Sequence, residues 1–226
     1  EITADEFAES IDRVIAGPER RSRLISNREK ELTAYHEAGH ALVAHLLPHA
    51  DPPFKVTIVA RGSTGGHTRY LPEEDRTLWT KNQFEDMLAA ALGGRVAEEV
   101  VFDELTTGAS NDLEQATNIA RTMVTRYGMS DKLGPRTFGK RQDLVFLGRE
   151  IAEQADYSDR VAETIDDEVH SIIDNAYQTA RRLLTSHTDK LSNVAKYLLS
   201  NETAEGETLL ALFNTVPGVA DAAPAG

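Results

Sequence analysis

The chain has 226 residues, and its 24 Lys and Arg against 37 Asp and Glu give a formal net charge of −13 at pH 7. A hydrophobic share of 40% suits a globular protein, and this length buries a sizeable core. The absence of cysteine excludes disulfides, thiolate zinc ligands and cysteine nucleophiles. The acidic balance argues against a nucleic-acid partner, and no apolar run approaches the roughly 18 residues of a membrane-spanning helix.

The N-terminal segment predicts a short amphipathic helix over residues 3–16. Thr3 and Glu6 form a capping box there, and apolar residues recur on one helical face. Residues 19–25 are charged and have no hydrophobic period, which is typical of a linker or a boundary.

A second helix is predicted from Ser26, which forms a capping box with Glu29, to Pro48. The segment FKVTIVA follows, and its alternation predicts a half-buried strand. The side chains expected to point inward are Phe54, Val56 and Ile58. A glycine-rich loop containing His67 comes next, and HTRYL is a candidate second extended segment.

The remainder of the chain has mainly helical periodicity. A capping box of Thr80 and Gln83 begins a helix that we expect to break at Gly93-Gly94, with a new helix after it. Ser110 or Asn111 is expected to cap the next helix. An irregular stretch over 128–148 precedes a long helix from about 158 to 185 and two short helices near 189–199 and 206–213. The sequence thus predicts a mainly α fold with one small β-sheet or hairpin.

The segment His36-Glu37-Ala38-Gly39-His40 carries the clearest chemistry. Side chains four residues apart on a helix lie one above the other, so His36 and His40 can bind one zinc ion. Glu37 then lies beside the metal, where it can deprotonate a bound water. The alternative is a pair of surface histidines with a solvated glutamate.

A catalytic zinc ion takes a third protein ligand and keeps one position for water. The carboxylate candidates are Glu98 and Glu99 on a downstream helix and Asp112 near the start of the next, and spacing alone does not choose among them. Three other histidines have no spacing that demands a metal: His45, His49 and His67. Of these, His67 could contact a substrate, but we expect a solvated loop residue. For Trp79 we expect a role in packing or at an interface rather than a substrate contact.

Six segments together resemble the protease domain of the FtsH family of membrane-anchored, ATP-dependent AAA+ zinc metalloproteases. They are AYHEAGHALVAHLLP, RYLPEEDR, GGRVAEEVVF, TTGASNDLEQATNIARTMVTRYGMSDKLGP, YSDRVAETIDDEVHSII and NETAEGETL. The resemblance implies a Zn²⁺ ion held by His36, His40 and Asp112, with Glu37 as general base. A direct metal role for Glu98 or Glu99 is the runner-up.

The resemblance also implies an organisation for the chain. Residues 1–25 would be the end of the ATPase lid and a linker, 26–213 the metalloprotease domain, and 214–226 a disordered tail. No phosphate-binding loop is present, so we expect a fragment of a longer protein with an ATPase module and a membrane anchor. That protein would form a homo-hexamer at the cytoplasmic face of a bacterial membrane, or its organelle counterpart, and degrade unfolded or misfolded proteins.

Two other functions remain open from the sequence. One is a catalytically inactive ring-assembly module with a structural zinc site, although such a module has no need of Glu37. The other is a stand-alone aminopeptidase or small-peptide hydrolase. The HTRYL segment could hold a substrate as an added β-strand, or it could be a plain hairpin in the core.

Overall fold

A computed structural model describes residues 26–60, 65–72, 76–139 and 157–214, together with residues 10, 13 and 14. The rest of the expected N-terminal helix, the 19–25 linker, residues 140–148 and the expected tail beyond residue 214 lie outside the described residues. Among the residues that are described, no helix has both the length and the apolar character needed to cross a membrane.

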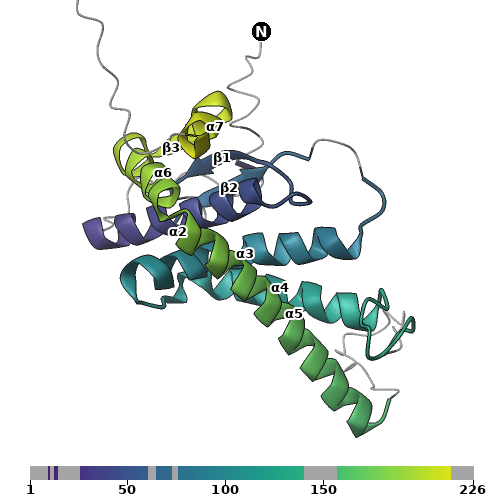
Figure 1. Ribbon diagram of the computed structural model, residues 1–226. Coiled ribbons are helices and arrows are strands. Elements are labelled where there is room, and N and C mark those ends of the chain that lie inside the picture. The colour runs from purple at the N-terminus through teal and green to yellow at the C-terminus, as the bar shows by residue number, and fades with distance from the viewer. Residues whose placement is uncertain are drawn as a thin grey trace, which may run out of the picture.

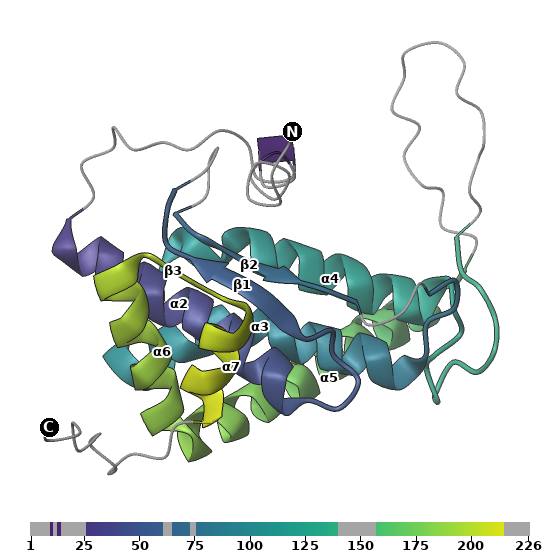
Figure 2. The same ribbon diagram turned by 90° about the horizontal axis from the view of Figure 1, so that it is seen from above.

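The predicted mainly α fold is confirmed (Figure 1). The helices are α2 (Asn27–Leu46), α3 (Lys81–Phe102), α4 (Ser110–Thr125), α5 (Asp159–Ser186), α6 (Thr188–Asn201) and α7 (Gly206–Asn214). The strands are β1 (Pro53–Thr57), β2 (His67–Tyr70) and β3 (Thr203–Glu205), which form one antiparallel sheet in the order β2-β1-β3. The sheet lies over α2, with β3 on the side of α6 and α7 and β2 on the side of α4 (Figure 2).

Helix α2 begins and ends where local chemistry dictates. The Ser26 hydroxyl accepts the Glu29 backbone N–H at 3.1 Å, and the Glu29 carboxylate accepts the Ser26 N–H at 3.2 Å, which confirms the predicted capping box. Leu47 is extended because Pro48 disfavours a helical conformation in the residue before it. From Ala34 onward the helix is largely buried.

Helix α3 packs against α2 through glycines, and it runs unbroken from Lys81 to Phe102. The predicted break at Gly93-Gly94 is therefore wrong. A Cβ on Gly93 would lie 2.7 Å from the Gly39 carbonyl oxygen, so these glycines permit close contact between the helices rather than ending one of them. Burial on α2 offsets the roughly 1 kcal/mol that a glycine costs in a helix.

The sheet differs from the prediction in two respects. Strand β3 carries no alternation of its own and was not predicted, but Ala204 pairs with Val56 of β1. The pairing of β1 with β2 shifts register between Pro53 and Lys55, so Phe54 is half-buried rather than inward. Val56 and Ile58 are buried as predicted, although Ile58 lies just beyond the end of β1.

The segment before α4 also departs from expectation. A single 3₁₀ turn, Thr107–Ala109, leads directly into α4, so neither Ser110 nor Asn111 caps the helix. Instead Thr106 caps the 3₁₀ turn by accepting the Gly108 N–H at 3.0 Å. The long helix α5 follows Ser158 as predicted and packs on α3 and α4, while α6 packs on α2.

The helix crossing yields a stability prediction. Gly93→Ala places a methyl group against the backbone of Gly39 and His40, which cannot move aside without separating the helices. We expect the free energy of unfolding, measured in urea, to fall by about 2 kcal/mol.

Gly65→Ala is the matched control, because its Cβ would meet only the side chain of Thr33. We expect that change to remain within about 0.5 kcal/mol. Equal stability of the Gly93 variant and the original chain would contradict the tight crossing.

Candidate metal and catalytic site

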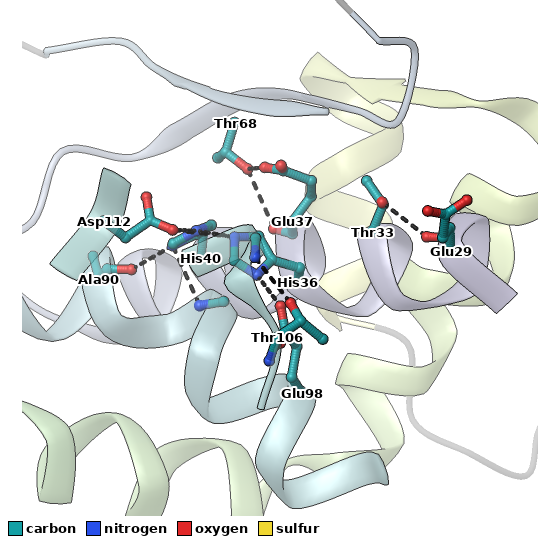
Figure 3. A network of polar contacts seen from close by, with 12 residues as sticks. Glu29, Thr33, His36, Glu37, His40, Thr68, Ala90, Glu98, Thr106 and Asp112 are labelled. Carbon is teal, nitrogen blue, oxygen red and sulfur yellow. Dashed lines mark hydrogen bonds and ion pairs between the residues drawn. The ribbon is translucent and has the colours of Figure 1, made fainter. Parts of the chain in front are cut away.

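Two histidines of α2 and one aspartate of α4 converge on a single point (Figure 3). His36 Nε2 and His40 Nε2 are 3.0 Å apart, and Asp112 Oδ2 lies 3.2 Å from the first and 3.5 Å from the second. One ligand atom from each residue falls within 4.8 Å of the other two. Asp112 is in the first turn of α4, so the chain from α3 through the 3₁₀ turn sets its position.

Hydrogen bonds on the far side of each ring fix which nitrogen faces the cluster. His40 Nδ1 lies 2.8 Å from the Ala90 carbonyl oxygen, which can only accept, so this nitrogen carries the proton. His36 Nδ1 lies 2.7 Å from Glu98 Oε1 and is oriented in the same way. Both Nε2 atoms therefore face Asp112, and each offers a lone pair to a metal when its ring is neutral. Three electron-pair donors facing one another fit a bound cation, and two imidazoles with a carboxylate suit Zn²⁺.

The electrostatics of the cluster favour positive charge. Burial lowers the pKa of His36, but its hydrogen bonds to Asp112 and Glu98 outweigh burial and raise that pKa to about 10. Burial raises the pKa of Asp112, whereas hydrogen bonds from His36 and His40 outweigh it and hold that pKa well below the usual range. The Asp112 carboxylate therefore stays ionised, and its negative charge stabilises a cation beside it.

Glu98 and Glu99, the alternative ligands, point in different directions. Glu98 faces the far side of His36 and also accepts the Thr106 N–H at 3.1 Å, so it orients a histidine. Glu99 accepts the Tyr177 hydroxyl at 2.6 Å and pairs with Arg181, which ties α3 to α5. Neither carboxylate joins the group of converging ligand atoms.

Glu37 lies on the same stretch of α2 and is only 7% exposed. Thr68 of β2 donates a hydrogen bond to Glu37 Oε2 at 2.9 Å. Burial raises the pKa of Glu37, and the lowering effects of His40, His36 and Thr68 do not cancel it. Gly66 allows this approach, since a Cβ there would lie 2.9 Å from Glu37 Cγ. The result is a carboxylate whose affinity for a proton exceeds the ordinary value.

A cavity of about 1110 Å³ opens over these residues. Its walls come from α2, α3, the start of α4 and β2, and both Thr33 and Trp79 line it. His67 is the first residue of β2 and lines this cavity with buried ring nitrogens, so the expectation of a solvated loop histidine is wrong. Trp79 stacks on Phe84 with ring centroids 5.7 Å apart, which agrees with the packing role expected for it.

Sequence reasoning named the converging residues but missed two partners. No sequence motif marks Thr68 or the Ala90 carbonyl. Each contributes only because the fold places it beside Glu37 or His40. Glu98 was expected near the site, and its bond to His36 gives it a definite place there.

Two histidines one helical turn apart, an intervening buried glutamate and a carboxylate as the third converging group are the arrangement of the zinc-dependent peptidases. The family model described as "Peptidase family M41" matches residues 23–212, and the chain belongs to this family. The resemblance noted in the sequence is thereby confirmed.

Similar curated proteins carry a consistent name. The chain is 63% identical over 209 residues, 92% of its length, to "ATP-dependent zinc metalloprotease FtsH 1" of Sphaerobacter thermophilus. It is 62% identical over 209 residues, again 92% of its length, to the protein of that name in Thermomicrobium roseum. It covers 32% of each of these relatives, about a third of their length.

The different surroundings of the adjacent glutamates give a prediction for metal affinity. Glu98→Gln replaces the charged partner of His36 with a neutral amide, and we expect zinc affinity to fall about 10- to 100-fold in chelator competition. Glu99→Gln is the matched control and should leave zinc affinity unchanged, because its partners are on α5. Equal losses in the two variants would contradict the orienting role of Glu98.

Proposed function

We propose that this chain is the zinc-dependent endopeptidase domain of a larger protease, with His36, His40 and Asp112 as metal ligands and Glu37 as general base. The observation that carries the proposal is the convergence of the three ligand atoms beside a buried carboxylate, at the wall of a cavity of about 1110 Å³. The names of the relatives, which include the words zinc and metalloprotease, support this proposal.

The chain's own residues suit each step of peptide hydrolysis. A bound Zn²⁺ would supply a Lewis acid for the carbonyl and lower the pKa of a water. Glu37 accepts a proton from the attacking water and passes it to the departing amine, so the carboxylate is regenerated in each cycle. Thr68 holds the Glu37 carboxylate in place, and Glu98 with the Ala90 carbonyl holds the two imidazoles. A substrate lying along β2 would expose its backbone to this centre.

We extend the proposal to the parent protein. Residues 1–25 form the end of an ATPase lid and a linker, 26–213 the protease domain and 214–226 a tail. An ATPase module and a membrane anchor elsewhere in that protein deliver unfolded or misfolded proteins to a homo-hexamer at the cytoplasmic face of a bacterial membrane. Support comes from relatives about three times as long that are named ATP-dependent.

Glu37→Gln tests the catalytic role. Glutamine has nearly the same shape but cannot take the proton, so we expect casein hydrolysis by the zinc-loaded chain to fall at least about 100-fold. Zinc content and the unfolding midpoint should not change. Glu163→Gln on the exposed face of α5 is the control and should keep full activity.

Two outcomes would overturn this assignment. Loss of zinc from the Glu37 variant would make Glu37 a ligand. If the unsubstituted chain, loaded with zinc, leaves casein intact, an assembly module is favoured. If cleavage is confined to the ends of labelled peptides, an exopeptidase is favoured.

Asp112→Ala tests the third ligand. Removal of this carboxylate leaves two imidazoles, so we expect zinc affinity to fall by more than the roughly 100-fold limit for an orienting residue. Asp112→Asn should be intermediate, because an amide oxygen is a weak ligand. Glu98→Ala and Glu99→Ala should still bind stoichiometric zinc. Stoichiometric zinc in Asp112→Ala, with loss in either glutamate variant, would move the ligand role to α3.

A further inference from the structure

Strand β2 directs a second side chain, besides Thr68, toward the site. Alternate residues of a strand lie on one face, so Tyr70 lies on the face that Thr68 uses to reach Glu37. The backbone there is fixed, since Tyr70 pairs with Pro53 and the next residue, Leu71, donates to the Pro52 carbonyl at 3.0 Å. Tyr70 lines the same cavity as the converging ligand atoms.

The hydroxyl of Tyr70 differs from that of Tyr177 in its surroundings. Its ring is half-buried and packs against the core, yet Oη has no hydrogen-bond partner within the described part of the chain. Tyr177, by contrast, donates its hydroxyl to Glu99 at 2.6 Å. A buried or half-buried phenol normally finds a partner, so a free hydroxyl at a cavity wall is available to a ligand in that cavity.

The surroundings keep this phenol protonated. Burial raises the pKa of Tyr70, and the carboxylates of Glu37 and Asp112 raise it further, because a phenolate would be repelled by both. Tyr70 therefore remains a neutral hydrogen-bond donor at neutral pH. The same two carboxylates oppose any additional negative charge in the cavity, which includes the charge that a scissile carbonyl oxygen acquires on attack.

We propose that Tyr70 is a further catalytic residue of this site, whose hydroxyl donates a hydrogen bond to the carbonyl oxygen of the scissile peptide bond. The inference rests on the proposed peptidase function. As the water oxygen bonds to the carbonyl carbon, the π electron pair moves onto the carbonyl oxygen, and the Tyr70 O–H stabilises that charge without giving up its proton. Glu37 holds the proton of the water until the C–N bond breaks and the amine takes it.

Tyr70→Phe removes Oη and keeps the ring. For a fluorogenic peptide we expect kcat to fall about 100-fold, the lower end for loss of one oxyanion donor, with KM nearly unchanged. Zinc content and the unfolding midpoint should match the original chain. Tyr127→Phe is the control, because Tyr127 stacks on Phe84 outside the cavity, and its activity should not change.

A binding measurement separates this proposal from the proposed function. A phosphonamidate peptide carries an anionic tetrahedral oxygen where the carbonyl oxygen would be, and calorimetry measures its affinity without turnover. We expect Tyr70→Phe to weaken phosphonamidate binding by a factor close to its loss in kcat, while the affinity for a product peptide stays the same.

The outcomes are distinguishable. If the unsubstituted chain does not cleave peptides, the proposed function is wrong. The phosphonamidate affinities would still decide the role of Tyr70. Unchanged kcat and unchanged phosphonamidate affinity in Tyr70→Phe would overturn the inference. A rise in KM with kcat intact would also overturn it, since it would make Tyr70 a contact for the ground state of the substrate.

Discussion

The contact between the backbones of α2 and α3 is the constraint on which the rest of the site depends. Gly39 and Gly93 meet without side chains between them, and a Cβ on Gly94 would lie 2.6 Å from His36 Nε2. Side chains of ordinary size would hold two helices 8–10 Å apart. Because these glycines allow a closer approach, the Ala90 carbonyl and the Glu98 carboxylate of α3 reach the imidazoles of α2.

Each further element adds side chains of the site to that pair of helices. Helix α4 brings the carboxylate of Asp112, and β2 covers Glu37 through Thr68 and adds Tyr70 to the cavity wall. The converging groups repel one another unless a cation or a proton lies among them. A metal bound there would therefore stabilise the packing of α2, α3 and α4 together, and its loss would weaken the same packing. Metal binding and the stability of the fold would therefore be coupled at this point.

Much of the local structure could be predicted because its causes are local. The capping boxes of Ser26 with Glu29 and of Thr80 with Gln83 satisfy backbone N–H donors within a single turn, and both occur as predicted. In two places where the prediction was wrong, a distant segment decided the outcome. Gly93-Gly94 continues a helix because α2 lies opposite, and residues 203–205 form a strand because β1 offers an edge.

The sequence by itself determined the two histidines and the glutamate of the candidate site, since the spacing of His36, Glu37 and His40 on one helix fixes their relation at the level of a single turn. It left Asp112, Glu98 and Glu99 as alternatives, because positions more than 50 residues away are related only through packing. The tertiary structure set Asp112 beside both Nε2 atoms, Glu98 behind His36 and Glu99 toward α5. Whether a carboxylate faces a metal or supports its ligand depends on the helix crossing, which no local pattern encodes.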